Sequence, residues 1–297
     1  MSIVKNSAHS ISRDLIHVSI DNDALDALIA RIQANNSKPT PWNDWQSHYK
    51  GVNKVNYIFA LDALNFCFWP KPGFEYDNLA GNLKALMERD PNILSPNSIA
   101  AMTDEFIQQE IFQDASFPLI NERCRLLREI GEQTIKCYAG DFNNILNSCQ
   151  NSSEKLVEII TAIFPGFRDS CVYRGRQAFF YKRAQILVAD LYASGAYEFN
   201  DIEKITMFPD YRVPQLLNTY GVLKYSQKLQ NKIDSKILIQ VGSEMEVEIR
   251  AATVKACDII SSRLDRIPIE VDHLLWQMGE LSLNTLKEHH RTLTIFY

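Results

Sequence analysis

Apolar residues along this chain of 297 residues recur with the period of a helix more often than with the alternation of a strand. One clear run has the spacing i, i+3, i+4, i+7: Leu25, Leu28, Ile29 and Ile32. This spacing places the four side chains on one helix face. The Asp-Asn-Asp sequence at 21–23 offers N-terminal caps. The pattern therefore predicts an amphipathic helix that begins at these residues.

Two further segments have the same periodicity. Residues 153–163 follow a serine cap and stop before a Pro-Gly pair, which are start and stop signals of a helix. Residues 119–130 form another apolar face, and Gly131 after it is expected to be a terminator or a kink. Both segments are predicted to be helices.

Longer, mostly buried helices are predicted at 178–193 and 246–264, because neither segment contains glycine or proline. Strand signals are sparse, and the best candidates are residues 236–241 and 292–297. No repeat or flexible linker is visible. The expected fold is mainly α with few short strands, a single compact helical body over residues 1–297, or two lobes that meet near residue 150.

Charge and hydropathy exclude several classes of protein. The 31 basic and 36 acidic residues give a net charge of −5, whereas a surface for duplex nucleic acid needs clustered cations. The longest apolar stretch, residues 57–69, contains an aspartate and is shorter than the roughly 20 residues of a membrane helix. The N-terminus lacks the apolar core of a secretory signal, so we expect a cytoplasmic protein with no membrane partner.

Several common active sites have no counterpart in the sequence. There is no glycine-rich phosphate loop, no nucleophile elbow and no H-E-x-x-H zinc motif. The six cysteines form no C-x-x-C pair and are expected to be reduced and mostly buried. His289 and His290 are adjacent, so on a regular element they point in different directions. We therefore expect neither a metal nor a cofactor.

Residues 56–70 are the first of three stretches that could form a binding site. On a helix, two polar and two aromatic residues of this stretch share one face: Asp62, Asn65, Phe66 and Trp69. Such a face suits a pocket wall that stacks a flat ring and hydrogen-bonds its edge. The alternative is a buried aromatic face with one satisfied aspartate.

The second stretch, residues 206–215, contains two prolines. Pro209 and Pro214 restrict their own backbone and that of the preceding residue, so Asp210 and Arg212 are held on a stiff, non-helical segment. Stiff segments suit catalytic groups, because such groups must be placed within roughly 0.5 Å. A helix cap or a surface ion pair is the alternative interpretation.

The third stretch, residues 171–190, concentrates positive charge in an otherwise acidic protein. Its four cations are Arg174, Arg176, Lys182 and Arg183. Together they could bind one phosphate or carboxylate group. A solvated charged face is the alternative, although the surroundings of Lys182 are strongly apolar.

Together these stretches resemble the queuosine salvage protein family, the queuosine 5′-phosphate N-glycosidases. The matching motifs are ALDALNFCFW at 60–69, FYKRAQILVAD at 180–190, ITMFPDYRVPQLL at 205–217, GVLKYS at 221–226, EVEIRA at 246–251 and VDHLLW at 271–276. The similarity extends over about residues 20–297. It implies an all-helical fold akin to the helix-hairpin-helix DNA glycosylases. It also implies cleavage of the N-glycosidic bond of queuosine 5′-phosphate, which releases queuine for reuse in transfer RNA.

The resemblance implies roles for individual acidic residues. Asp210, within the matching DYRVPQ motif, is expected to stabilise the oxocarbenium-like transition state or to orient water. Asp272, or Asp62 as the second candidate, is expected to bind the amine-bearing arm of queuine or the guanine-like N–H edge. His48, in WQSHYK, is expected to contact substrate or to be structural.

Other residues of the matching motifs are expected to bind the substrate. The base would lie against Phe208, Pro209 and Tyr211, beside the wall that contains Asn65 and Phe66.

Lys182, Arg212 or Arg174 would hold the 5′-phosphate. The sequence departs from the family pattern at Cys67, where a small polar residue is expected, and at Pro209, where a small residue is common. A proline at this position would restrict the loop without removing Asp210.

Three other functions remain open at this stage. A protein that binds queuine or its nucleotide without turnover would use the same pocket. A helical repair glycosylase would need a cationic track that the charge of −5 disfavours. A structural scaffold leaves the Asp-Tyr-Arg segment unexplained. The partner we expect is a small-molecule substrate, bound by a monomer.

Overall fold

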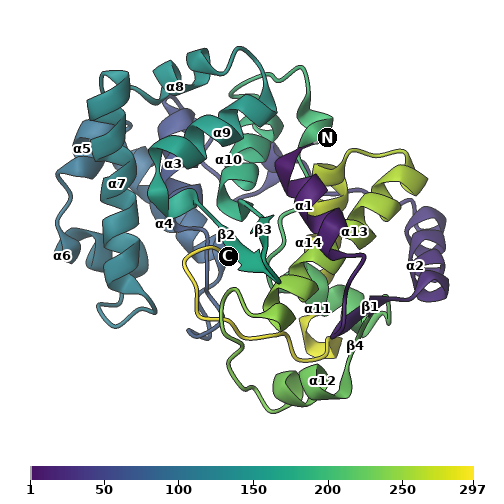
Figure 1. The fold of residues 1–297 in the computed structure, drawn as a ribbon. Helices are drawn as coiled ribbons and strands as arrows, with labels where there is room; N and C mark the ends of the chain where they lie inside the picture. The colour runs from purple at the N-terminus through teal and green to yellow at the C-terminus, as the bar shows by residue number, and fades with distance from the viewer. Residues whose placement is uncertain (1) are drawn as a thin grey trace.

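The computed structural model describes residues 2–297, and helices dominate it (Figure 1). The α-helices are α1 (Ile3–Ile11), α2 (Asn22–Ala34), α3 (Lys54–Leu64), α4 (Tyr76–Arg89), α5 (Pro96–Ala100), α6 (Asp104–Phe106), α7 (Ile120–Tyr138), α8 (Phe142–Ser148), α9 (Ser153–Ile163), α10 (Lys182–Ala193), α11 (Arg212–Thr219), α12 (Gln227–Asp234), α13 (Glu244–Leu264) and α14 (Pro268–Leu281). The other helical segments are the π-helix η2 (Ile107–Phe112) and the 3₁₀ turns η1 (Trp42–Asp44), η3 (Pro165–Phe167), η4 (Ile202–Lys204) and η5 (Leu283–Thr285). The prediction of a mainly α fold is confirmed.

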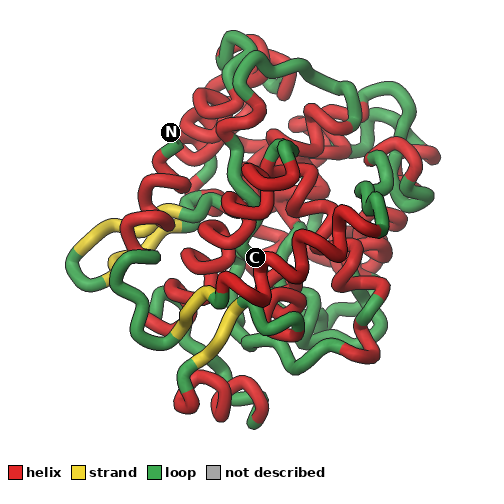
Figure 2. Tube along the Cα trace, turned by 90° about the vertical axis from the view of Figure 1, so that its right-hand side faces the viewer, coloured by secondary structure: helices red, strands yellow, loops and turns green. Residues whose placement is uncertain are grey.

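Four short strands form two small antiparallel sheets, drawn as yellow segments on one side of the body in Figure 2. Strand β1 (Val18–Ile20) pairs with β4 (Leu223–Tyr225), and β2 (Ser170–Tyr173) pairs with β3 (Arg176–Phe179). The second pair is a hairpin whose turn contains Gly175 at φ +76°, a conformation that glycine adopts without strain.

Helix starts that depend on a local cap lie where the sequence predicts them. The Asp21 side chain accepts a hydrogen bond from Ala24 N (2.9 Å) at the start of α2. Ser152 does the same for Lys155 N (3.3 Å) at the start of α9. Such a cap satisfies a backbone N–H that has no partner within the helix.

Helix α7 continues through Gly131, which is therefore not a terminator. A Cβ atom at this position would lie 2.6 Å from Pro96 O and 2.7 Å from Ala100 N, both in α5. The glycine is needed because α5 and α7 approach each other there.

Other boundaries differ from the prediction. The helix expected over 178–193 begins only at Lys182, because the residues before it belong to β3. Residues 236–241 form one isolated bridge, Leu238 to Arg291, instead of a strand, and residues 292–297 form none. In this segment Ile239 is buried, but Ile237, Leu238 and Val241 are exposed, so the side chains do not form the continuous buried face of a paired strand.

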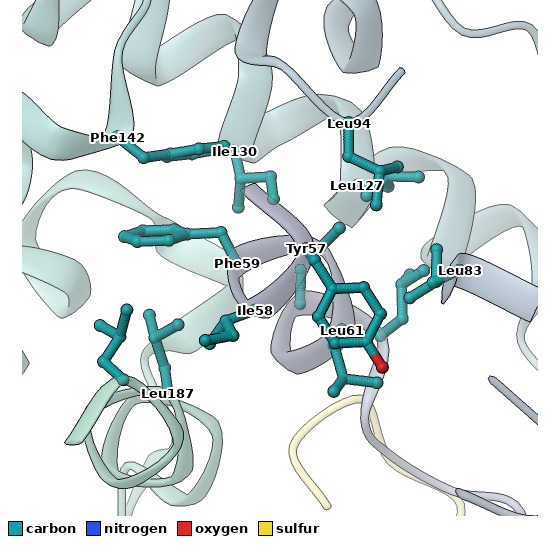
Figure 3. Packing of buried hydrophobic residues seen from close by; sticks show 14 of the residues in the cluster. Tyr57, Ile58, Phe59, Leu61, Leu83, Leu94, Leu127, Ile130, Phe142 and Leu187 are labelled. Atoms are coloured by element: carbon teal, nitrogen blue, oxygen red, sulfur yellow. The ribbon is translucent and has the colours of Figure 1, made fainter. Parts of the chain in front are cut away.

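Most buried apolar side chains belong to two large clusters, each of which gathers elements distant in sequence. In the first cluster, Phe59 of α3 stacks on Phe142 of α8 with ring centroids 4.2 Å apart (Figure 3). The second cluster surrounds α13 and includes residues of α2, α11 and α14. Burial of each such side chain stabilises the fold by about 1.5–3 kcal/mol.

The chain passes from Cys149 to Leu156 inside the first cluster, so the clusters do not divide at residue 150. The single helical body, with two lobes as its alternative, stays a prediction. All six cysteines are free, and four of them are buried. Within residues 2–297, no helix has the length and apolar character that crossing a membrane requires.

Candidate active site

A pocket with about 1080 Å³ of empty space, its open mouth included, collects side chains from segments far apart in the sequence. They come from the residues before α3, the loop after α3, the start of α4, α10, the segment that leads into α11, α14 and the C-terminal residue. Of the residues that the sequence predicts for a site, nine line this pocket: His48, Asn65, Phe66, Lys182, Phe208, Asp210, Tyr211, Arg212 and Asp272. The structure therefore brings the three candidate stretches together.

Asp210 lies at the pocket wall immediately before α11. Its Oδ1 accepts hydrogen bonds from Arg212 N (2.8 Å) and Val213 N (3.3 Å), the first backbone N–H groups of that helix. Burial raises the pKa of Asp210, whereas Lys182 and these N–H donors oppose the rise. Capping the helix thus occupies one carboxylate oxygen and leaves the other for the pocket.

Lys182 is the first residue of α10 and is buried. Its Nζ donates to Asn65 O (3.0 Å), and its backbone N donates to Asp169 Oδ2 (3.1 Å). Burial lowers the pKa of Lys182, and the nearby charges of Asp210 and Asp62 oppose that fall. The site therefore combines a carboxylate with an ammonium group.

Arg212 is already paired inside the pocket. Its Nε donates to Glu280 Oε1 (2.6 Å), and a terminal nitrogen donates to Gln215 Oε1 (2.7 Å). A substrate phosphate would compete with Glu280 for this guanidinium. Arg174 is bound to Glu244 (2.9 Å) and does not line the pocket.

Two buried carboxyl groups, Asp272 and Asp190, also face the pocket. Asp272 Oδ1 accepts a hydrogen bond from Phe208 N (2.9 Å), and burial raises its pKa well above the ordinary value. Burial raises the pKa of Asp190 to about 7. The nearby N–H of Trp42 favours the carboxylate and so opposes this rise of the pKa. Neither Trp42 Nε1 nor Asp190 Oδ2, however, completes a hydrogen bond among the described residues. Buried polar atoms without partners are uncommon, and a bound ligand would satisfy them.

His48 supports the aromatic side of the pocket. A carbonyl can only accept, so the contact with Trp42 O (2.9 Å) places the proton on His48 Nδ1. Burial lowers the pKa of His48 to about 4, so the ring is neutral and Nε2 accepts from the Tyr76 hydroxyl (2.8 Å). Tyr76 in turn packs edge-on against Trp276, with ring centroids 5.8 Å apart.

The prediction that Asp62, Asn65, Phe66 and Trp69 share a helix face is wrong. Helix α3 ends at Leu64, and the chain then turns away through Cys67 at φ +48°. Asp62 is completely buried behind the pocket, where Asn65 Nδ2 lies 3.5 Å from its Oδ1. The structure therefore separates Asp62 from the pocket surface.

Pro209 is buried and does not line the pocket. Its carbonyl accepts a hydrogen bond from Arg250 Nε (2.9 Å). The residue therefore fixes the backbone beside Asp210, while the rings of Phe208 and Tyr211 face the cavity.

Sequence reasoning missed several pocket residues: Trp42, Trp45, Tyr76, Asp190, Trp276, Glu280 and Tyr297. Asp190 and Trp276 end two of the motifs quoted above, FYKRAQILVAD and VDHLLW, so attention to the polar and aromatic ends of those motifs would have found them. Tyr76 follows the irregular loop after α3, and no local pattern marks it. Among residues 2–297, no cluster of three or more His, Cys, Asp and Glu side chains could hold a metal ion.

Comparison with known proteins agrees with the motifs. The sequence model of the queuosine salvage protein family matches residues 46–297. A queuosine 5′-phosphate N-glycosylase/hydrolase of Dictyostelium discoideum is 39% identical, and the match covers 100% of this chain and 99% of that protein. Proteins of the same name from Sphaerobacter thermophilus and Mus musculus are 38% and 32% identical, over 94% and 82% of this chain and 93% and 82% of their own lengths. The chain therefore belongs to the queuosine salvage protein family.

Proposed function

We propose that this chain hydrolyses the N-glycosidic bond of queuosine 5′-phosphate and releases queuine. The observation that carries the proposal is the Asp210 carboxylate, which lines a pocket beside the buried Lys182 ammonium. The name shared by the relatives supports the same reaction. The pocket combines aromatic walls with several polar groups, as expected for a ligand with a flat base and a sugar phosphate.

In the reaction, the bond between C1′ of the ribose and the base nitrogen breaks, and its electron pair leaves with the base. Positive charge then develops on the sugar, and an ionised Asp210 stabilises it. Water adds its oxygen to C1′, and the two protons of that water end on the new sugar hydroxyl and on the base nitrogen. Asp210 can orient this water and accept a proton from it in transit.

The leaving base needs help because queuine is a 7-deazaguanine and lacks the N7 that purine glycosidases often protonate. Burial favours the protonated form of Asp272, and Asp190 titrates near neutral pH. A protonated carboxyl donates a hydrogen bond to an acceptor, and an ionised one accepts from N–H groups. We assign these two groups to the polar edge or the amine arm of the base.

The phosphate would bind Lys182, Arg212 or both, since these cations line the pocket. Arg212 would then exchange part of its pairing with Glu280 for the phosphate. A substrate limited to a free mononucleotide, a monomeric state and a cytoplasmic location stay predictions.

The direct test is release of queuine from queuosine 5′-phosphate, followed by chromatography. Asp210→Asn is expected to reduce the rate by about 10²–10⁴-fold, because the amide carries no charge. Asp141→Asn is the matched control, since Asp141 caps the short helix α8 through Asn143 N (2.9 Å) in the same way and lies outside the pocket. Equal release by the unaltered protein and a folded Asp210→Asn variant would refute the assignment of Asp210. Binding of queuine without release by the unaltered protein would favour a non-catalytic binding protein.

A further inference from the structure

Arg250 of α13 is a buried cation behind the pocket, with 2% of its surface exposed. Its guanidinium lies between two aromatic rings, 4.0 Å from the ring centroid of Phe180 and 4.4 Å from that of Tyr297. All three of its nitrogens donate hydrogen bonds. Nε donates to Pro209 O (2.9 Å), and the two terminal nitrogens donate to the Asp169 carboxylate (2.9 and 2.5 Å).

The contact with Pro209 O holds the peptide that leads directly into Asp210. Asp210 N also donates to Phe208 O (2.8 Å), which tightens the same turn. With its carbonyl held from behind by Arg250 and its side chain tied to the start of α11, this segment has little freedom to rotate. Arg250 therefore acts on the orientation of Asp210 through the backbone.

The contact with Asp169 holds the start of the helix that carries Lys182, the other charged residue of the site. Asp169 Oδ2 also accepts from Lys182 N (3.1 Å), and Asp169 O accepts from Phe180 N (3.0 Å) and Tyr181 N (3.2 Å). These bonds set where α10 begins, and Lys182 is its first residue. One guanidinium thus connects the segment that carries Asp210 to the segment that carries Lys182.

Stability alone does not account for this arrangement. Arg250 also pairs with Glu246 (3.3 Å), so three charged side chains are buried together. Replacing such a group by apolar residues of similar volume is often neutral or stabilising, because removing charges from water is costly. A planar guanidinium does, however, hold several acceptors at fixed angles, which neither an apolar side chain nor a lysine can do.

We propose that Arg250 is a positioning residue that fixes the Asp210 carboxylate relative to the Lys182 ammonium. The proposal rests on the proposed function for the role of Asp210, but the geometry it describes exists without substrate. Loss of the guanidinium fork would let the two charged groups move apart, while Trp42, Tyr76 and Trp276, pocket residues that Arg250 does not hydrogen-bond or stack against, stay in place.

Several charged groups act on Asp210 and have to be considered together. Lys182 of α10 and Arg212 of α11 favour its ionised form. Asp272 and Glu280 of α14 interact with it unfavourably. If Lys182 moves away, its opposition to the effect of burial on the pKa of Asp210 weakens, and Asp210 keeps its proton to a higher pH.

The test compares Arg250→Lys with Glu248→Gln in steady-state release of queuine across a pH series. Glu248 is a matched control because it is also buried in α13, yet it binds Ile16 N, His17 N and Tyr173 OH, away from the pocket. Arg250→Lys is expected to lower kcat at least tenfold, to leave KM within about threefold and to shift the acid limb of kcat to higher pH. Glu248→Gln is expected to lower only the melting temperature. A folded Arg250→Lys protein with the unaltered kcat and acid limb would overturn the proposal.

A second measurement separates this proposal from the proposed function. Protein with ¹³C-labelled aspartate carboxyl groups is titrated by NMR, and the Asp210 signal is identified by its loss in Asp210→Asn. The Asp210 signal is expected to titrate at a higher pH in Arg250→Lys, whether or not the protein releases queuine. If Arg250→Lys does not fold, Asp169→Asn replaces it, because it weakens the connection from Arg250 to Lys182. An unchanged Asp210 titration in the folded variant would refute the proposal.

Discussion

Two features of Asp210 act in opposite directions on its charge. Its place in the wall of a largely buried pocket favours the protonated carboxyl, which raises its pKa. The Lys182 ammonium and the backbone N–H groups of α11 favour the carboxylate. The net effect is an elevated pKa. Forming the carboxylate that the reaction needs therefore lowers the stability of the folded protein.

This loss of stability predicts how the effect of Asp210→Asn on the melting temperature depends on pH. The pKa of Asp210 is raised in the folded protein above the ordinary value of 3.8. Ionisation of Asp210 therefore destabilises the fold most at a pH above its pKa in the folded protein. This loss of stability disappears as the pH falls to the pKa that Asp210 has in the unfolded chain. Asparagine keeps an acceptor for Arg212 N and carries no charge.

Asp210→Asn is therefore expected to have a higher melting temperature than the unaltered protein at pH 8. The difference is expected to shrink steadily as the pH falls to 4, and circular dichroism melting curves at several pH values measure it. A variant that melts at a lower temperature at pH 8 would contradict the prediction, since it would mean that the buried carboxylate stabilises the fold.

At the scale of elements, the early end of α3 creates one wall of the pocket. Arg123 of α7 is completely buried and donates to Leu64 O (2.9 Å), Phe66 O (2.6 Å) and Cys67 O (2.9 Å). Arg183 donates to Ala63 O, and Lys182 donates to Asn65 O. A helix C-terminus carries partial negative charge, so three cations stabilise an end at this point.

Arg123→Met removes the side-chain donor of Phe66 O and Cys67 O and one of two donors to Leu64 O. Each buried carbonyl left unsatisfied costs about 1–3 kcal/mol. We expect a loss of several kcal/mol of unfolding free energy, together with a raised KM, because Phe66 and Cys67 line the pocket. Arg125→Met on the same helix is the control, since Arg125 makes only exposed ion pairs with Glu122 and Glu129, and such pairs contribute about 0–1 kcal/mol. Denaturant unfolding measures both variants, and similar losses would refute the role of Arg123.

These contacts also explain which elements could be predicted from the sequence. The starts of α2 and α9 depend on Asp21 and Ser152, which lie next to the helices they cap, so a local pattern reveals them. The end of α3 depends on Arg123, which lies far away along the chain, and the apolar run of residues 56–70 continues past it. Local periodicity contains no information about such a partner.

At the scale of the whole molecule, the pocket forms only when both hydrophobic clusters are folded. Phe208 and Trp42 belong to the first cluster, while Trp276 packs against the second, and all three line the cavity. The motif resemblance predicted Asp210 and Asp272, which lie within matched segments, but not Asp190 and Trp276, which lie within matched segments as well. It did not predict Tyr76, whose place in the site depends on how α4 packs in the folded chain.

The charge of the whole molecule predicts that the substrate is a mononucleotide and not a polynucleotide. The net charge is −5, and Glu75, Asp77 and Glu280 line the pocket together with Lys182 and Arg212. Binding of a polyanion through 6–10 phosphate contacts weakens by about 10³–10⁵-fold between 50 and 200 mM salt, because each contact releases counterions. A mononucleotide brings one phosphate to this site. Accordingly, kcat/KM for queuosine 5′-phosphate is expected to change by only about threefold over this range of salt.

Transfer RNA that contains queuosine is expected neither to release queuine in this assay nor to inhibit release from the mononucleotide. The phosphate backbone of the transfer RNA would meet a protein of net charge −5, which disfavours the binding of a polyanion. The experiment measures initial rates at several salt concentrations, with and without the transfer RNA. A steep fall of kcat/KM with salt, or competitive inhibition by the transfer RNA, would show that the protein recognises a polynucleotide, and the pocket would then have to act on a base presented by a larger molecule.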